Sequence, residues 1–390
     1  INHINFCSMM TCTKGIWNET IPGISFDENG ISNYAKLQQS LMDKFPRGEV
    51  GKHDWDNLVL KMKEDGVGKP YDCIIGVSGG TDSSYLLHLA HQEGLRALAI
   101  NLDNGWSSDI AVKNIKKVTS ALGIDLETYV IDYEEVKDVL RSYIRACLPW
   151  IDFPTDYAIH AIFYQTAAKE GLKYVLTGSD FRSEGKQPSE WTYGDYRQFK
   201  HVTQTFGSGK KLHTYPVLPF EKQLYYGYFK GIKQIAPFYY LPYQKKAAQK
   251  LLEDTYGWEY YGGHHHENIF TKFAIGYWMY KKFGFDKRLI TLSAQVLSGE
   301  ITREEALEKI NQLPYALDQM ERDREYVVKK LDMTAEEFQK VWQSPIKLFK
   351  DYPSYYPLIE KGARLLTPIA KLVLPQTPKI FLEIEQRKSK

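Results

Sequence analysis

The segment Val77-Ser78-Gly79-Gly80-Thr81-Asp82-Ser83-Ser84 decides the fold class of this chain. It follows a short apolar run, CIIGV (Cys73 to Val77), which is typical of a buried strand. The sequence SYLLHLAHQEG comes next and predicts a helix that ends at Gly94. In a strand, glycine-rich turn and helix of this kind, the backbone N–H groups and the helix N-terminus face one point, where they favour an anion. We therefore expect this turn to bind phosphate groups.

Strands and helices continue to alternate after this turn. We expect strands at residues 97–103, 127–132 and 174–177, and helices at residues 109–123, 134–147 and 157–171. Alternation at this spacing specifies a parallel sheet with helices on both faces. The predicted fold class is therefore α/β, with ligand sites at the carboxyl ends of the strands.

Changes in the local residue pattern divide the chain into three predicted parts. Residues 1–70 are rich in turn signals and form an irregular N-terminal module with one helical stretch, Tyr34 to Phe45. Residues 71–225 hold the phosphate loop and the predicted sheet, and residues 226–390 are mainly helical. In the last part, Thr302 and Thr334 each precede a Glu by three residues, which is the signature of a capping box.

The composition excludes several classes of protein. The 390 residues are 43% hydrophobic and 25% charged, as in an ordinary globular protein. Fifty Lys and Arg residues stand against 48 Asp and Glu residues, so the net charge of +2 gives no reason to expect a nucleic-acid partner. The four cysteines are too few and too irregular for a disulfide framework, and the first residues lack the apolar core of a signal peptide. We expect a cytoplasmic protein that acts on a small molecule.

No run of about 18 apolar residues occurs, so we expect no transmembrane segment. Residues 358–382 are apolar with scattered Lys and Arg, and contact with a membrane surface is an alternative for them. Their prolines, Pro368, Pro375 and Pro378, would break any long helix there.

Carboxylates near the phosphate loop suggest a metal site. Asp82 stands among phosphate donors, where an anion is unfavourable unless a cation is present, so Asp82 is a candidate Mg²⁺ ligand. Asp180, at the end of YVLTGSD, is the second candidate ligand. Asp103, at the end of ALAINLD, is placed to meet the nucleotide or the substrate. For Asp180 and Asp103 the alternative is capping of the turn that follows each strand.

The string SGGTDSS resembles the PP-loop signature SGGxDS of the ATP pyrophosphatases, which include asparagine, GMP and NAD synthetases and tRNA-modifying enzymes. It lacks the GK[ST] of a Walker A loop and is not GxGxxG. The resemblance implies that ATP is cleaved between its α and β phosphates while the loop holds the pyrophosphate portion. The candidate ATP-binding residues are Ser78, Gly79, Gly80, Thr81, Asp82, Ser83, Ser84, Asp103, Gly178 and Ser179.

Further segments narrow the resemblance. They are IPGISFDENGISNY (Ile21 to Tyr34), LDNGW (Leu102 to Trp106), FPTDYA (Phe153 to Ala158), TGSDFRSEG (Thr177 to Gly185), GWEYYGGHHHEN (Gly257 to Asn268), FTKF (Phe270 to Phe273), FGFDKR (Phe283 to Arg288) and LSAQVLSGEITREEAL (Leu292 to Leu307). Together they resemble the N-acetyl sugar amidotransferases, PP-loop enzymes of bacterial surface-polysaccharide synthesis, over roughly residues 10–320.

That resemblance implies a reaction and its partners. A nucleotide-activated acetamido sugar would have its N-acetyl amide oxygen adenylated and replaced by ammonia, giving an acetamidino sugar for lipopolysaccharide O-antigen, capsule or flagellin glycans. The ammonia would come from a separate glutaminase subunit similar to HisH, with a HisF-like subunit as a further candidate partner.

The candidate residues for this reaction carry charges that suit substrate and leaving group. The candidate catalytic residues are Asp82, Asp180, Lys272 and Arg288, the candidate substrate contacts are Asp156, Arg182, Glu184, His265 and Glu267, and Lys186 and Lys287 are further candidates for substrate or leaving-group contacts. The alternative for each outside the loop is a solvated surface charge. A metal shared by the consecutive histidines 264–266 is disfavoured, because adjacent side chains rarely point to one centre.

One departure from the family concerns zinc. Many members carry two early cysteine pairs that would make a four-cysteine zinc site, whereas here Cys12 remains and the partner positions are Gly15, Ser32 and Ala35. We therefore expect ATP and Mg²⁺ as cofactors and no structural zinc.

Three rival functions remain open. A tRNA-modifying PP-loop enzyme would be expected to show a basic face and, in thiolating members, a reactive cysteine pair. A self-sufficient glutamine-dependent synthetase needs a glutaminase domain, for which the roughly 70 residues before the loop are too few. A degenerate nucleotide-binding module is disfavoured by the intact SGGTDSS and by Asp180.

Overall fold

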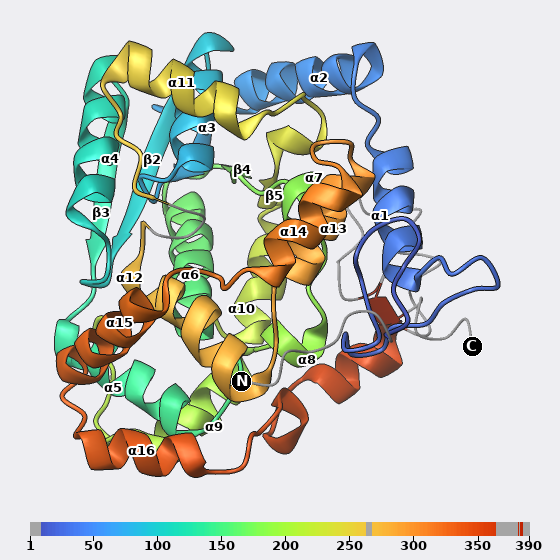
Figure 1. Ribbon diagram of the computed structural model, residues 1–390. Helices are drawn as coiled ribbons and strands as arrows, with labels where there is room; N and C mark the ends of the chain where they lie inside the picture. Colours follow the sequence, from blue (N-terminus) through green and yellow to red (C-terminus); the bar gives the residue numbers. More distant parts are fainter. Residues whose placement is uncertain (1–8, 263–266, 364–380, 382, 385–390) are drawn as a thin grey trace.

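A five-stranded parallel sheet forms the centre of the part of the molecule that holds the SGGTDSS loop (Figure 1). The computed structural model describes residues 9–262, 267–363, 381 and 383–384. The strands run in the order β3-β2-β1-β4-β5, and each adjacent pair is parallel. Their bounds are β1 (Cys73–Gly76), β2 (Ala97–Asp103), β3 (Asp125–Val130), β4 (Tyr174–Leu176) and β5 (Lys233–Ile235). The strand order reverses between β1 and β4, and in open sheets of this type ligands bind at such a reversal.

Both faces of the sheet are covered, which confirms the predicted α/β class. Along β1, Cys73 and Ile75 pack into one apolar cluster, whereas Ile74 packs into another on the opposite face. Side chains alternate in this way because successive residues of a strand point to opposite faces. The first face is covered by α2 (Glu49–Asp65), α3 (Thr81–Gln92), α4 (Asp109–Leu122) and α11 (Lys245–Tyr256), and the second by α6 (Phe153–Lys169).

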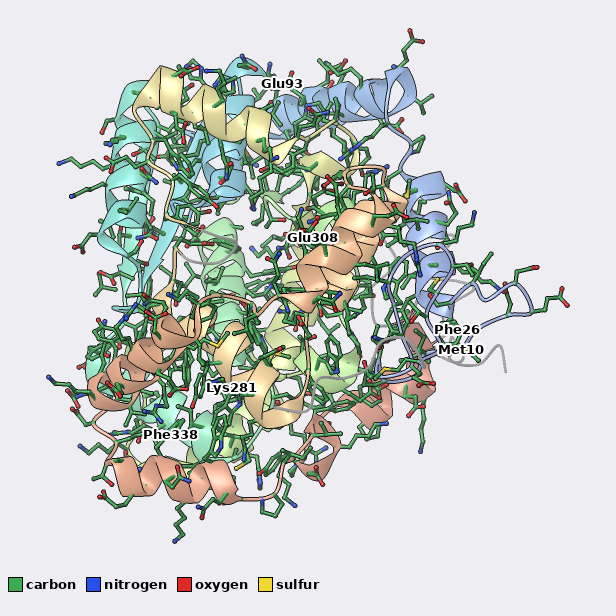
Figure 2. The ribbon with its side chains drawn as sticks, in the orientation of Figure 1. Met10, Phe26, Glu93, Lys281, Glu308 and Phe338 are labelled. Atoms are coloured by element: carbon green, nitrogen blue, oxygen red, sulfur yellow. The ribbon has the colours of Figure 1, made fainter. Side chains whose placement is uncertain are left out.

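The C-terminal helices form a second layer of structure beside the sheet. They are α12 (Ile269–Phe273), the π-helix η4 (Ala274–Phe283), α13 (Arg288–Leu297), α14 (Arg303–Asn311), α15 (Leu317–Lys330), α16 (Ala335–Gln343) and η5 (Phe349–Asp351). With α5 (Tyr133–Arg145) and α9 (Tyr196–Phe206) they enclose a large apolar core, in which the rings of Trp278 and Phe338 lie 6.3 Å apart. Figure 2 shows Phe338 on α16 at the lower end of the molecule. Thr302 makes both bonds of the predicted capping box.

Short elements connect these layers. They are α1 (Asn33–Lys44), α7 (Phe181–Glu184), α8 (Ser189–Thr192), α10 (Phe220–Leu224), the π-helix η2 (Tyr225–Phe229) and the 3-10 helix η3 (Pro237–Tyr239). Within the described ranges no helix combines the length and the apolar character needed to cross a membrane. Residues 364–380, 382 and 385–390 lie outside the described residues, and with them most of the segment for which membrane contact was an alternative.

Two elements differ from the expectations of the sequence. The N-terminal module holds α2 as well as α1, because Trp55, Val59 and Met62 recur at helical spacing and bury one face of α2. β5 lies in a region predicted to be helical, since its sequence Lys-Gln-Ile is too short and too polar to give a strand pattern. The sheet thus continues past residue 225, and the division into domains at residues 70 and 225 stays a prediction.

The N-terminal module is held by close packing around Cys12. The Cys12 thiol is buried and accepts a hydrogen bond from the Ser32 N–H at 3.3 Å, and the Ser32 hydroxyl in turn caps α1 by accepting from the Ala35 N–H. A side chain at Gly15 would meet the Trp17 ring at 2.7 Å. Two of the positions at which the family carries cysteines, Cys12 and Ser32, are therefore in contact. The expectation that the module holds no zinc stays a prediction.

We expect Gly76→Ala to lower the free energy of unfolding by about 1–3 kcal/mol, because overpacking forces neighbours to move. A Cβ at Gly76, the last residue of β1, would lie 2.1 Å from Phe163 Cζ of α6. Chemical denaturation measures the effect. Gly227→Ala is the matched control, since nothing lies within 4 Å of a Cβ there and its φ is not positive. A Gly76→Ala protein as stable as the wild type would show that α6 does not press on β1 as described.

Candidate active site

The loop between β1 and α3 is shaped by two glycines. Gly79 has a φ of +78°, and a Cβ there would lie 2.1 Å from the Ala111 carbonyl oxygen at the start of α4. At Gly80, a Cβ would lie 3.0 Å from the Tyr261 hydroxyl and 3.2 Å from the Ser78 hydroxyl. Gly79 has no room for a side chain, and a Cβ at Gly80 would require small shifts of the two hydroxyl groups, so the backbone itself forms the wall of the site.

The peptide unit between Gly79 and Gly80 is fixed from behind. The indole N–H of Trp258 donates to the Gly79 carbonyl oxygen at 3.1 Å, and the Asn114 amide donates to the same oxygen at 3.4 Å. Because a trans peptide points its N–H opposite to its C=O, these bonds orient the Gly80 N–H toward the other side of the loop. There it donates to the Ser78 hydroxyl at 3.3 Å. A phosphate oxygen would be a stronger acceptor than this hydroxyl.

The first turn of α3 adds further donors. The Thr81 N–H donates to the Tyr261 hydroxyl at 3.1 Å, and the Ser83 hydroxyl lies 3.3 Å from the Ser78 hydroxyl. Hydroxyl groups rotate easily to serve a new acceptor. Together with the partial positive charge of the α3 N-terminus, the loop is suited to an anion.

Asp82, in the first turn of α3, is held by two side chains from a distant part of the sequence. The Tyr243 hydroxyl donates to its Oδ1, and the Lys245 Nζ lies 3.0 Å from its Oδ2. Burial opposes the positive charge of Lys245, but the Asp82 carboxylate outweighs burial and raises the pKa of Lys245. Lys245 is therefore a firmly charged ammonium at the phosphate loop.

Asp180 is a buried carboxylate at the end of the loop after β4, with 1% of its surface exposed. Its Oδ1 caps α7 by accepting from the Arg182 N–H at 3.1 Å. Its Oδ2 lies 3.6 Å from the Arg47 guanidinium and has no hydrogen-bond partner within the described residues. Burial raises the pKa of Asp180, and the charge of Asp82 raises it further.

These two carboxylates fit a Mg²⁺ ion that is completed by its substrate. Asp180 offers an oxygen without a hydrogen bond, and the mutual repulsion with Asp82 would be relieved by a cation. No cluster of three or more His, Cys, Asp or Glu side chains suited to a metal occurs in the described part of the chain. Mg²⁺ typically takes one or two carboxylates together with phosphate oxygens and water, so two protein ligands suffice.

A cavity of 350 Å³ opens at the carboxyl ends of the central strands. Its wall includes Gly76 and Ser78 after β1, Asn101 on β2, and Thr177 and Gly178 after β4. A Cβ at Gly178 would lie 3.0 Å from the backbone of Asp82, so the loop after β4 presses directly on α3. We call this space the loop cavity. It lies where the strand order reverses, as expected for a nucleotide site in such a sheet.

A second, larger cavity of 690 Å³ adjoins the loop cavity, and we call it the cationic cavity. The charged side chains on its wall are the cations Lys186, Lys272, Lys287 and Arg288 and the carboxylates Asp156 and Glu184. Cations outnumber carboxylates on the wall itself, and Lys186, Lys272 and Arg288 are paired with the carboxylates of Glu383, Asp323 and Asp286. Two of these residues, Asp156 and Lys287, also line the loop cavity.

The junction of the two cavities is a compact cluster. The Lys287 Nζ lies 4.2 Å from the centre of the Trp150 ring, and the Trp150 N–H donates to the Asp156 Oδ2 at 2.8 Å. Burial lowers the pKa of Lys287, while the nearby carboxylates of Asp156, Glu184 and Asp152 oppose that effect. A cation and a carboxylate thus meet where two bound molecules would touch.

Eight of the predicted site residues line these cavities. Ser78, Gly178 and Glu267 line the loop cavity, Ser179, Glu184, Lys272 and Arg288 line the cationic cavity, and Asp156 lines both. Gly79, Gly80, Thr81, Asp82, Ser83 and Ser84 form the loop and the first turn of α3. His265 lies outside the described residues. The roles of all these residues stay predictions.

Several predicted site residues already form ion pairs or hydrogen bonds within the protein. Lys272 pairs with Asp323 at 2.6 Å, and Arg288 pairs with Asp286 at 2.6 Å. Arg182 is buried and donates to the backbone carbonyls of Phe45 and Tyr239. Asp103 accepts from the Gly105 N–H at 2.9 Å, which is the turn capping given as its alternative.

Sequence reasoning missed Tyr243, Lys245 and Tyr261, which contact Asp82 and Thr81 from more than 160 positions along the chain. The run YQKK (Tyr243 to Lys246) is an ordinary start of a basic helix, and no local pattern links it to the loop. Only tertiary structure reveals that it completes the site.

Comparisons with known proteins agree with this geometry. Residues 73–179 match the family model "Asparagine synthase", and residues 267–365 match "LPS biosynthesis protein WbpG-like, C-terminal domain". No curated protein matches the chain.

Two solved structures are similar at low identity. NMN synthetase from Francisella tularensis is 14% identical over 64% of this chain and 94% of its own, with a TM-score of 0.27. The U34-tRNA thiolase NcsA from Methanococcus maripaludis, with its [4Fe-4S] cluster, is 12% identical over 87% and 90%, with a TM-score of 0.33. Neither likeness is close enough to indicate a substrate.

The fold and the loop define a PP-loop protein of the ATP-utilising class, with the phosphate loop inside the region matched by the asparagine synthase model. With its matching C-terminal region, the chain is similar to lipopolysaccharide-biosynthesis proteins of the WbpG-like type.

We expect Asp180→Asn to raise the melting temperature at neutral pH. Because the folded-state pKa of Asp180 is raised, the folded protein binds a proton more readily there, and ionised Asp180 weakens the fold above that pKa. Asn keeps the capping of α7 without the charge. The gain should shrink as the pH falls through the raised pKa toward 3.8. Thermal melts of wild type, Asp180→Asn and the control Asp103→Asn across this range measure it. A lower melting temperature for Asp180→Asn at neutral pH would mean that the pairing with Arg47 outweighs burial.

Proposed function

We propose that this protein is an ATP-dependent amidotransferase that converts the N-acetyl group of a nucleotide-activated sugar into an acetamidino group, releasing AMP and pyrophosphate. The observation that carries the proposal is the meeting of two cavities. One lies at a phosphate loop, the other is rich in cations, and they share Lys287 and Asp156. Such a junction suits a reaction between ATP and a second anionic molecule.

The chemistry explains why ATP is needed. The amide oxygen attacks the α-phosphorus of ATP, a new O–P bond forms, and the bond to pyrophosphate breaks. Ammonia then attacks the imidoyl carbon, and the C–O bond breaks as AMP leaves with the former amide oxygen. AMP is a far better leaving group than an amide oxygen, and both steps depend on positioning and on stabilising charge.

The loop residues would hold the pyrophosphate portion. The N–H groups around Gly80 and the N-terminus of α3 supply donors, and Lys245 supplies a positive charge beside them. Mg²⁺, bound by Asp82 and Asp180, would neutralise charge on the departing pyrophosphate. Tyr243 and Lys245 would keep Asp82 in place until the ion and ATP arrive.

The junction residues would act on the second molecule. Lys287, stacked over Trp150, would hold the α-phosphate against the amide oxygen. Asp156, oriented by the Trp150 N–H, would accept a proton from ammonia as the new C–N bond forms. The other cations of the cationic cavity would bind the phosphates that carry the sugar.

The tRNA-modifying alternative is not favoured. Thiolating enzymes need a reactive thiolate, whereas the three cysteines among the described residues, Cys12, Cys73 and Cys147, are buried, and burial raises the pKa of both Cys73 and Cys147. Cys7 lies outside the described residues. The net charge of +2 also gives little attraction for a nucleic acid.

We expect Asp82→Asn to lower AMP formation by about a hundredfold or more without unfolding the protein, since it removes a charged metal ligand rather than core volume. The assay is chromatographic detection of AMP with ATP, Mg²⁺, ammonium and acetamido sugar nucleotides. Asp56→Asn, a change at an exposed carboxylate on α2, is the control. AMP formation by Asp82→Asn near the wild-type rate would remove the proposed metal site.

We expect the protein alone to turn over with high ammonium at raised pH and to fail with glutamine. Ammonia is nucleophilic only when deprotonated, so the rate with ammonium should rise with pH. A matching glutaminase should restore the use of glutamine. The comparison is the rate of AMP formation with each nitrogen source. Equal efficiency with glutamine and ammonium for the isolated chain would contradict the two-component arrangement.

A further inference from the structure

A third cavity, of 500 Å³, continues from the cationic cavity. The two share Asp156, Lys186 and Thr192 on their walls, so one extended molecule would be able to occupy both. The third cavity differs from its neighbour in character, because six of the fifteen residues on its wall are Phe or Tyr. We call it the aromatic cavity.

The aromatic rings of this cavity are Phe153, Tyr157, Tyr193, Tyr196, Phe220 and Tyr355. They come from distant elements and are held in fixed pairs. Phe220 of α10 stacks on Tyr355 at 5.1 Å with 28° between the ring planes, and Phe153 stacks on Tyr157 at 5.7 Å with 24°. Phe220 and Tyr355 are partly exposed, so ring surface remains accessible to a ligand. A planar ring is the ligand that such walls bind best.

Uncharged polar groups complete one side of the aromatic cavity. The Gln223 amide nitrogen lies 3.2 Å from the His160 Nε2. Burial lowers the pKa of His160 to about 4, so the imidazole is neutral near pH 7. A neutral imidazole and an amide offer both donors and acceptors without a charge. They suit the polar edge of an uncharged heterocycle rather than a phosphate.

A cation stands between the aromatic rings and the rest of the cationic cavity. Lys186 lines both cavities, and its Nζ lies 3.2 Å from the buried carboxylate of Glu383 and 3.0 Å from the Gln187 carbonyl oxygen. Beyond it lie Lys272, Lys287 and Arg288. The three cavities meet at Asp156, and Lys186 lies where the aromatic and cationic cavities adjoin.

We propose that the aromatic cavity binds the nucleobase of the sugar nucleotide, with its phosphates beside Lys186 and its acetamido group at Lys287. This inference rests on the proposed function, because it assigns the parts of that substrate to places. The base stacks on the ring surface of Phe220 and Tyr355, and its edge bonds to Gln223 and His160. Recognition of the carrier is thus separated from the place where the amide reacts.

The test is calorimetric titration of the full chain with UMP and with CMP, using ribose 5-phosphate as the base-free probe. A saturating non-hydrolysable ATP analogue fills the loop cavity first, so that the probes report on the other site. We expect at least one nucleotide to bind more tightly than ribose 5-phosphate. Phe220→Ala and Gln223→Ala should each reduce that difference by roughly tenfold, the size expected when one stacked base or its hydrogen bonds are lost.

The matched control is Phe229→Ala, which removes a ring that is 82% exposed and does not line the aromatic cavity. It should leave the difference unchanged, and circular dichroism checks that each variant is folded. Binding that is independent of the base, or a base preference that survives both Phe220→Ala and Gln223→Ala, would overturn the proposal. If the base site is overturned in this way but the protein still forms AMP with an acetamido sugar phosphate that lacks a base, the proposed reaction is supported and only the base site is wrong. Base-dependent binding without any AMP formation would overturn the reaction and keep the binding site.

Discussion

The site depends on the close approach of three backbone segments. The loop after β1 lies so near α4 that a Cβ at Gly79 would meet the Ala111 carbonyl oxygen at 2.1 Å. The loop after β4 lies so near α3 that a Cβ at Gly178 would meet the Asp82 backbone at 3.0 Å. Because protein interiors yield little to such overlaps, these glycines set the positions of the helix N-terminus, of Asp82 and of Asp180 together.

The close packing includes the buried carboxylate of Asp180, which lowers the stability of the fold, and electrostatic interactions explain what this carboxylate would bind. Burial of Asp180 beside Asp82 raises its pKa, so the ionised pair weakens the fold at neutral pH. Tyr243 and Lys245 balance Asp82, whereas Asp180 has only the more distant guanidinium of Arg47 at its second oxygen. A bound cation and phosphate would stabilise this arrangement of charges most. The charges at the site therefore lower the stability of the unliganded fold, and ligand binding would raise it again.

The sequence predicted the parts of the fold that local patterns encode. The strand, loop and helix around Ser78 to Ser84 are contiguous, so their order alone gave the phosphate site and the α/β class. β5 was missed because Lys233–Ile235 is a short edge strand defined by its pairing with β4. Charged residues at the cavities were found by resemblance, but their partners, such as Asp323 for Lys272, follow only from the packing of helices.

What the sequence could not supply is the connection between distant segments. Lys245 reaches Asp82, and Lys287 reaches Trp150 and Asp156, only after the C-terminal helices pack against the sheet. That packing turns a phosphate loop into a site with two adjoining cavities. It also places the aromatic cavity next to the cations, as the base of a sugar nucleotide is next to its phosphates.

The most direct test of the central claim follows the oxygen of the acetamido group. An acetamido sugar nucleotide that supports AMP release is prepared with a heavy oxygen isotope in its amide and incubated with ATP, Mg²⁺ and ammonium, and the products are analysed by mass spectrometry. Adenylation of the amide predicts that the heavy oxygen appears in AMP and that the sugar product carries an acetamidino group. Heavy oxygen retained in the sugar, or found in pyrophosphate, would contradict the account.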